Sequence, residues 1–283
     1  LPIQETNSFE HRSALDGVSH KCGHDGHMTI LYATGLELEK VAPKGDVYLL
    51  FQPAEEIGEG AKATLEDEGF TPRFKPDYIF ALHNVPGFQL HSIQVKKHNL
   101  TPAVISATVS FIGKTSHAAE PQNGLNPSYF ASEIELFCKD KNNTDPNDPN
   151  FKIITPIVIH IGSKDFGVSA GTGSTGFTIR THQNDEMEHL KEEFIAELDR
   201  LSKKYQIPYM LEWSHAFSAI ENNEECVQLI EESARENELP VNLLNAPFPW
   251  GEDFGLFTEK FKGAMFGLGS GENHASLHNP DYD

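Results

Sequence analysis

The sequence predicts an α/β domain that is interrupted by an inserted α+β module. The first part of the chain alternates a helical pattern with short apolar runs that are typical of buried strands. The middle has strands of alternating apolar residues together with two helices, as expected of an antiparallel sheet covered on one face. Patterns of the first kind return from about residue 218. We therefore expect one domain at residues 1–96 and 217–283 and the inserted module at residues 97–216.

In the first part, apolar residues at three- and four-residue steps predict a helix from Asp25 to Val41, which stops before Pro43. Val47–Phe51 and Tyr78–Leu82 are continuous apolar runs, and each is bounded by turn-forming or polar residues. Runs of this length and composition indicate strands that are buried on both faces.

Polar side chains leave the ends of both expected strands. Glu55 and Glu56 follow the first strand, and His83 follows the second. Because ligands of open α/β sheets bind outside the carboxyl ends of the strands, these three side chains are expected at one edge of the sheet. This shared position makes His83 a ligand candidate.

The middle and the end of the chain complete the set of expected elements. The period of apolar residues in the longest helix places Met187, Leu190, Phe194, Leu198 and Leu201 on one face. Strands are expected at residues 105–111, 152–161, 176–182 and 263–267, and helices at residues 127–137, 185–204 and 223–237.

Composition excludes several classes of partner. The net charge of −20 disfavours nucleic acid and anionic membranes, and no apolar run approaches the roughly 18 residues of a membrane span. Three cysteines, Cys22, Cys138 and Cys226, are too few and too scattered for a disulfide framework. Such cysteine usage suits a reducing compartment, so we expect a cytoplasmic protein.

The most informative residues are Cys22 and His24, followed by the pair Glu55 and Glu56. A thiolate, an imidazole and a carboxylate are ligands of divalent metal ions, and a second carboxylate is available for proton transfer. A Cys-x-His pair is usually incidental, and Glu-Glu pairs usually lie on solvated helix faces. Their occurrence within some 35 residues, each beside an apolar run, favours a metal site instead.

Six motifs occur in order over nearly the whole chain. They are Cys22-Gly-His-Asp-Gly-His27, Gln52-Pro-Ala-Glu-Glu-Ile-Gly-Glu-Gly60, Ala81-Leu-His-Asn84, Ser116-His-Ala-Ala-Glu-Pro121, Gly251-Glu-Asp-Phe254 and Leu277-His-Asn-Pro280. With these motifs the chain resembles the M20 metallopeptidase family, in the amidohydrolase branch of N-acyl-amino-acid, hippurate, N-acetyldiaminopimelate and auxin-conjugate hydrolases. The family begins with further residues that include an Asp-Met-Asp-Ala-Leu-Pro segment, so this chain resembles a fragment without the first part of the catalytic domain.

The resemblance implies a zinc-peptidase-like mixed sheet with flanking helices and an inserted lid and dimerisation domain. It also implies two divalent metal ions per subunit. Cys22 would bridge both ions, His24 and His83 would complete one site, and Glu56 and His278 would complete the other. From the residues alone, His278 is instead a surface turn residue before Asn279-Pro280. Glu55 would be the general base that activates a water for attack on an amide carbonyl.

The resemblance further implies that His117 of the inserted module is catalytic, polarising the substrate, and that a partner subunit of a homodimer often supplies it. From the residues alone, His117 is a turn histidine. Arg180 suits either a substrate carboxylate or a structural salt bridge. His27 is expected in the core or behind the ligands, and Asp25 is expected to orient a ligand.

The expected function is deacylation of N-acyl amino acids, with a small-molecule substrate and no nucleic-acid or membrane partner. A dipeptidase or carboxypeptidase of the same family, a thiol hydrolase that uses Cys22, and a metal-binding relative without turnover remain alternatives. Zn, Mn, Co and Ni all suit a set of Cys, His and carboxylate ligands.

Overall fold

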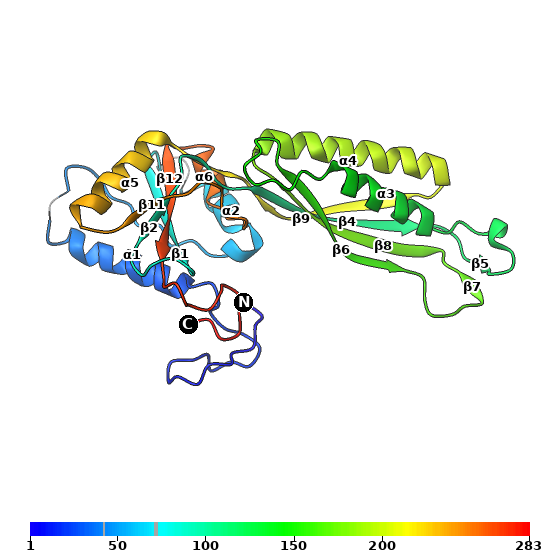
Figure 1. Cartoon of the computed structure of the whole chain (residues 1–283), viewed down its shortest axis with the longest axis horizontal. Helices are drawn as coiled ribbons and strands as arrows, with labels where there is room; N and C mark the ends of the chain where they lie inside the picture. The colour runs from blue at the N-terminus through cyan, green and yellow to red at the C-terminus, as the bar shows by residue number, and fades with distance from the viewer. Residues whose placement is uncertain (42, 71–72) are drawn as a thin grey trace. The chain divides into compact units, whose positions relative to one another are not determined.

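The computed structural model describes residues 1–41, 43–70 and 73–283, and these residues form two compact units (Figure 1). The first unit comprises residues 1–100, 221–245 and 256–283, and the inserted unit comprises residues 101–220 and 246–255. Both long boundaries lie four residues beyond the positions expected from the sequence. Residues 246–255 were expected in the first unit, but they pack with the inserted one.

A mixed four-stranded sheet in the order β1-β12-β2-β11 organises the first unit. β1 (Ile79–Val85) runs parallel to β12 (Gly263–Gly269), and this pairing places His83 opposite Gly267. Helix α5 (Glu224–Glu236) packs Cys226, Val227 and Ile230 against the sheet. The other elements are α1 (His24–Leu38), α2 (Gly60–Glu66), β2 (Ile93–Val95), β3 (His98–Thr101), β10 (Ile220–Asn222), β11 (Val241–Leu243) and α6 (Gly255–Thr258), with a 3-10 turn at Glu55–Ile57.

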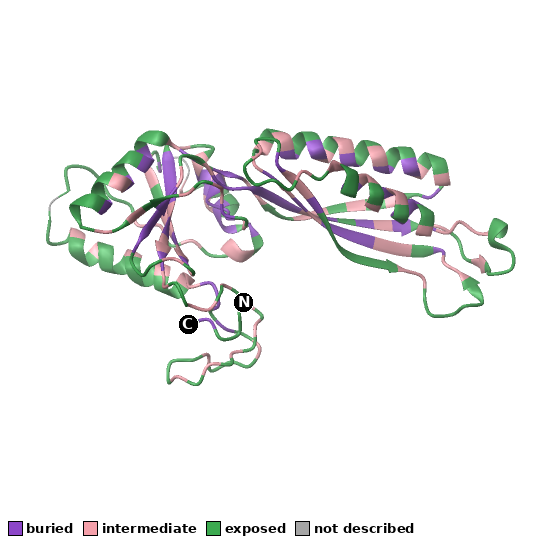
Figure 2. Ribbon diagram, viewed as in Figure 1, coloured by how far each residue is buried: buried purple, intermediate pink, exposed green. Residues whose placement is uncertain are grey.

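The inserted unit is an antiparallel sheet in the order β6-β8-β4-β9, with both long helices on one face (Figure 1). All five apolar residues expected on one face of the longest helix are buried, because that face packs on the sheet (Figure 2). The expected α+β architecture is therefore confirmed. Its elements are β4 (Ala103–Ile112), β5 (Ser116–His117), α3 (Ser128–Lys141), β6 (Lys152–Ile161), β7 (Val168–Ser169), β8 (Thr172–Thr181), α4 (Asn184–Tyr205) and β9 (Tyr209–Phe217), with a 3-10 turn at Pro121–Asn123.

One expected strand is absent. Val47–Phe51 was expected to be buried on both faces, but it forms no strand, and about half of the surface of Val47 and Phe51 is exposed. An extended segment becomes a strand only when a neighbouring strand pairs with it, and no described strand does so here.

Helix α1, unlike that strand, is present, but none of its residues is buried. Its apolar residues Met28, Tyr32 and Leu36 are exposed.

Among the described residues, no helix is both long enough and apolar enough to span a bilayer. The three cysteines are buried and form no disulfide.

The turn before α1 is fixed by a close approach to β1. Gly23 caps the helix with φ 85°, in the left-handed region that glycine adopts without a steric penalty. A Cβ atom at Gly23 would lie 2.6–2.8 Å from the side-chain amide of Asn84 in β1. Only a residue without a side chain therefore lets Cys22 and His24 pass this close to the end of β1.

This constraint predicts opposite effects for two neighbouring glycines. Gly23→Ala should lower the free energy of unfolding by about 1–3 kcal/mol, because it combines left-handed strain with a clash. Gly26→Ala is the matched control, since Gly26 lies in the same helix with open space around its Cβ position. It should be neutral or stabilise the protein by up to about 1 kcal/mol. Urea unfolding measures both values, and equal effects of the two substitutions would contradict the constraint.

Candidate metal centre

The structure brings the five expected metal ligands and Glu55 together from four segments of the first unit. Cys22 and His24 lie at the start of α1, and His83 lies in β1. Glu55 and Glu56 form the 3-10 turn at residues 55–57, although the strand expected before them is missing. His278 comes from the loop that follows β12.

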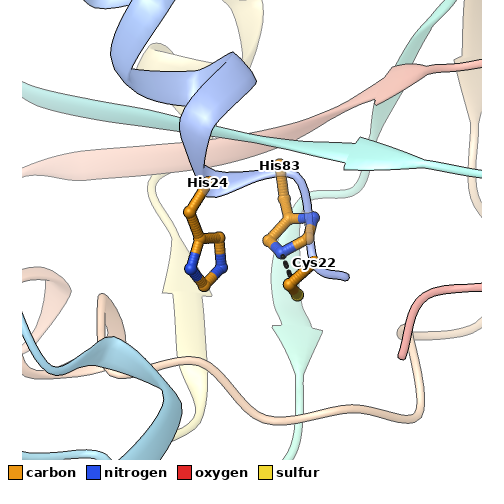
Figure 3. Close-up of side chains that lie close together, drawn as sticks. All are labelled: Cys22, His24 and His83. Atoms are coloured by element: carbon orange, nitrogen blue, oxygen red, sulfur yellow. Dashed lines mark hydrogen bonds between the residues drawn. The ribbon is translucent and has the colours of Figure 1, made fainter. Parts of the chain in front are cut away.

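Distances between the side-chain atoms are those of a compact cluster. Nε2 of His83 lies 3.5 Å from Sγ of Cys22, and the His24 ring lies beside both (Figure 3). Nδ1 of His24 is 3.8 Å from Oε1 of Glu56, and Nε2 of His24 is 3.4 Å from Oε2 of Glu55. Nε2 of His278 is 3.5 Å from Oε2 of Glu56.

The imidazoles of His83 and His24 are held in the neutral form that binds metal ions. The pKa of the His83 imidazole is lowered to about 3, chiefly by burial and to a smaller extent by the charge of neighbouring histidines. The pKa of the His24 imidazole is also lowered, mainly by burial and to a smaller extent by the charge of His27. In the neutral tautomer, Nδ1 of His83 donates to the carbonyl of Asn84 at 2.7 Å, which directs the lone pair of Nε2 toward Cys22.

Two ligand groups share Cys22. One group is Cys22, His24 and His83, and the other is Cys22, Glu56 and His278, with the ligand atoms of each group within 4.8 Å of one another. Tetrahedral ligands at about 2.0–2.3 Å from a metal ion lie roughly 3.3–3.8 Å from each other. The separations of 3.5–3.8 Å between these ligand atoms therefore fit metal coordination, and the two between imidazole nitrogen and Glu56 oxygen are longer than a usual hydrogen bond.

The backbone on either side of this cluster is strained. Ala54, directly before Glu55, has φ 59°, and His278 has φ 63°. Side chains other than glycine adopt such angles at a cost, and residues of this kind gather at functional sites. The strain at both positions lies where the chain presents a candidate ligand or base.

His117 lies apart from these residues in the sequence, in the inserted unit. It pairs with Val168 between β5 and β7, and its side chain is exposed. Its Nδ1 accepts a hydrogen bond from the backbone N–H of Ala119 at 3.1 Å. In the neutral ring the proton therefore sits on Nε2, so that Nε2 is a hydrogen-bond donor.

Asn84 and Tyr282, for which no role was expected from the sequence, support the cluster. Oδ1 of Asn84 lies 2.5 Å from Nε2 of His27. Nδ2 of the same side chain donates a hydrogen bond to the hydroxyl of Tyr282. Burial raises the pKa of that tyrosine to about 12. His27 thus lies behind the ligands, as expected. Asp25 is exposed, and His83 donates its orienting hydrogen bond to the backbone carbonyl of Asn84 instead.

Comparisons with known proteins agree on one family. The sequence model of peptidase family M20/M25/M40 matches residues 1–283. An N-acetyl-L-cysteine deacetylase of Bacillus subtilis (strain 168) is 30% identical over 287 residues, which cover 100% of this chain and 67% of the relative. A hippurate hydrolase of Campylobacter jejuni (subsp. jejuni serotype O:2) is 29% identical over 286 residues, which cover 100% of this chain and 73% of the relative.

Solved structures show the same fold. A Bacillus subtilis protein described as a dinuclear metal-binding peptidase of the M20 family superposes with a TM-score of 0.80 and 24% identity, covering 100% of this chain and 72% of that one. The mixed α/β architecture expected from the sequence is therefore confirmed. From the match over its whole length, the chain belongs to peptidase family M20/M25/M40.

Proposed function

We propose that this chain is a metal-dependent amidohydrolase that deacylates N-acyl amino acids. The observation that carries the proposal is the cluster in which Cys22 belongs to two ligand groups at metal-like spacing. Membership of the family makes the chain a hydrolase of amide bonds. The names of the relatives, a deacetylase of N-acetyl-L-cysteine and a hydrolase of hippurate, support N-acyl amino acids as the substrate class.

The donor set suits two divalent ions. Cys22, His24 and His83 would hold one ion, and Cys22, Glu56 and His278 would hold the other. A thiolate and the Glu56 carboxylate would offset part of the positive charge, while the neutral imidazoles of His24 and His83 would bind without first losing a proton. When bound, such ions polarise the amide carbonyl and make water a stronger acid.

Glu55 is the general base in this proposal. It lies next to the ligand Glu56 in the same short turn, and its Oε2 is 3.4 Å from the His24 ring. The Glu55 carboxylate takes a proton from the attacking water and then passes that proton to the departing amine nitrogen. The turn is bounded by left-handed residues on both sides, Ala54 and Gly58, which fixes the direction of both carboxylates.

Two residues of the inserted unit complete the proposed machinery. His117 donates a hydrogen bond from Nε2 to the substrate oxygen that gains negative charge in the transition state. The hydrogen bond from Ala119 to Nδ1 leaves the proton of the neutral ring on Nε2, where this role needs it. Arg180 in β8 binds the substrate carboxylate. Burial lowers the pKa of its guanidinium, and no described carboxylate forms an ion pair with it.

We infer that the chain forms a homodimer through the outer edge of β6 and the neighbouring face of α3. A groove of about 650 Å³ runs between these elements, and Ile157, Val158 and Ile159 beside it are more than half exposed. Apart from the isolated bridge between Asn143 and Lys152, no described strand pairs with this edge of β6. An antiparallel second copy would extend the sheet and cover the apolar residues.

Charge in the groove also favours a second copy of this chain. Glu135 and Lys139 lie one helical turn apart in α3, and both line the groove. A two-fold axis that passes α3 between these two positions would set Glu135 of each copy opposite Lys139 of the other. The cytoplasmic location expected from the cysteine usage remains a prediction.

Two measurements test the function. The first is the metal content of the purified protein, and the second is the release of amine from a panel of N-acetyl and N-benzoyl amino acids, with dipeptides as competing substrates. Chelation should abolish turnover, and a divalent ion should restore it. A thiol hydrolase would keep its activity in the chelator. Preferential cleavage of dipeptides would favour the peptidase alternative.

Substitution of the base separates turnover from metal binding. Glu55→Gln should keep the metal content of the wild type and lose roughly 10²–10⁴-fold in kcat, the usual weight of general acid–base catalysis. Glu59→Gln, an exposed carboxylate four residues on, is the matched control and should stay within about twofold. A kcat near the wild-type value in Glu55→Gln would remove this residue from the mechanism.

The dimer is tested at two edge strands of the same sheet. Ile157→Lys in β6 should convert the dimer into a monomer, because it puts a charge on a strand edge that the second copy covers. Met210→Lys in β9, at 61% exposure compared with 64% for Ile157, is the matched control and should leave the assembly unchanged. Light scattering after gel filtration measures the mass. Two monomeric variants, or two dimeric ones, would rule out this interface.

Hybrid dimers test whether His117 acts across the interface. His117→Ala should lower kcat more than it raises KM, because its donor helps mainly in the transition state. Mixing it with Glu55→Gln should restore roughly a quarter of the wild-type activity, since half of the dimers are hybrids with one complete site. No recovery, with subunit exchange verified, would place His117 in its own chain's site or in a structural role.

A further inference from the structure

Lys21 is a buried cation directly before the shared ligand Cys22. Only 1% of its side chain is exposed, and its ammonium group contacts Oε1 of Glu5 and the carbonyl oxygen of Tyr282, each at 2.5 Å. Lysine is almost never buried to this extent unless it is paired. The structure therefore commits a costly charge to this position, and nothing in the proposed chemistry uses it.

The two partners of Lys21 come from opposite ends of the chain. Glu5 lies in the segment before Cys22, and its carboxylate also accepts from the backbone N–H groups of Asn7 and Ser13. Tyr282 lies in the loop that carries His278, and its carbonyl also accepts from Nδ2 of Asn7 at 2.8 Å. The Lys21 ammonium thus joins these two segments at one point.

Lys21 also holds the same loop through its backbone. Its carbonyl oxygen accepts a hydrogen bond of 2.6 Å from the backbone N–H of His278. His278 needs such support, because its φ of 63° is strained and 53% of its side chain is exposed. The loop is therefore attached to residue 21 at both ends, at position 278 through the backbone and at position 282 through the side chain.

The two ligand groups differ in their dependence on this attachment. Cys22, His24 and His83 are held by the start of α1 and by β1. The group of Cys22, Glu56 and His278 needs the loop as well. Loss of the Lys21 ammonium removes the attachment at Tyr282 and leaves the backbone bond at His278, so it should loosen the loop and thereby disturb the second group, while the first group stays in place.

We propose that Lys21 is a positioning residue that holds His278 in place, and that it thereby sets the affinity of the second metal position and not of the first. This inference rests on the proposed two-ion function. Lys21 touches neither the substrate nor the reacting atoms in this proposal. It acts through the loop that it fixes.

The test is a metal titration of Lys21→Met, which keeps the length of the side chain and removes its charge. Zinc binding is followed by elemental analysis of the dialysed protein, and cobalt binding is followed by the thiolate absorption of Cys22. The wild type should bind two ions. Lys21→Met should keep the first ion with its thiolate absorption and bind the second ion about 10–100-fold more weakly. His278→Ala should give the same pattern.

Two further variants separate positioning from general stability. Lys21→Arg keeps a cation and should recover most of the affinity for the second ion. Lys21→Met combined with Glu5→Gln removes the unpaired carboxylate that the single change leaves buried, so it keeps the protein folded while the bond to Tyr282 stays lost. It should therefore still bind the second ion weakly.

Unchanged affinity for both ions in Lys21→Met, or an equal loss of both ions in the double variant, would overturn the positioning role and leave the proposed function intact. A wild-type chain that binds fewer than two ions would overturn the proposed function and this inference with it. Selective loss of the second ion, with recovery in Lys21→Arg, supports the inference.

Discussion

The whole cluster depends on how closely the turn before α1 approaches the end of β1. A side chain at Gly23 would overlap the Asn84 amide, so the contact exists only because that position has none. The residues around Gly23 then take their places from it. Sγ of Cys22 contacts the His83 ring, and His24 is the first residue of α1. The His27 ring contacts the side chain of Asn84. The arrangement of the candidate metal site thus depends on backbone packing.

From this contact the support extends outward in two directions. Asn84 bonds to His27 on one side and to the hydroxyl of Tyr282 on the other. Lys21 reaches the carbonyl of the same tyrosine. Residues from both ends of the chain and from β1 therefore form one hydrogen-bonded network behind the ligands. Such networks lose more than one bond when a single member is removed, because their members polarise and orient one another.

The sequence predicted what depends on local periodicity. The bounds of β6 match the expected residues 152–161, and the five apolar positions of α4 are all buried. These features follow from apolar patterns that repeat along one segment, and such patterns are visible without knowledge of the rest of the chain.

Features that depend on distant partners could not be predicted in this way. Val47–Phe51 has the composition of a buried strand but no described strand beside it, so its apolar pattern is not realised. Lys21 reads as a surface residue, yet it is buried by a contact with Tyr282, 261 positions away. Residues 246–255 pack with the inserted unit for the same reason. The ligand candidates were found from residue types, strand ends and motifs, whereas the bonds of Asn84 and Lys21 to Tyr282 join segments that are far apart in the sequence.

The exposed run Ile157-Val-Ile159 on the edge of β6 has a consequence for solubility. An uncharged apolar edge strand is a template for adding further strands, and it does not discriminate between a correct partner and a misfolded chain. Pro156 interrupts the donor pattern at only one position of this edge. A chain that stays dissociated would therefore be prone to aggregate through β6. Pairing of two copies at this edge would remove the template, so that assembly would protect the protein pool as well as complete the enzyme.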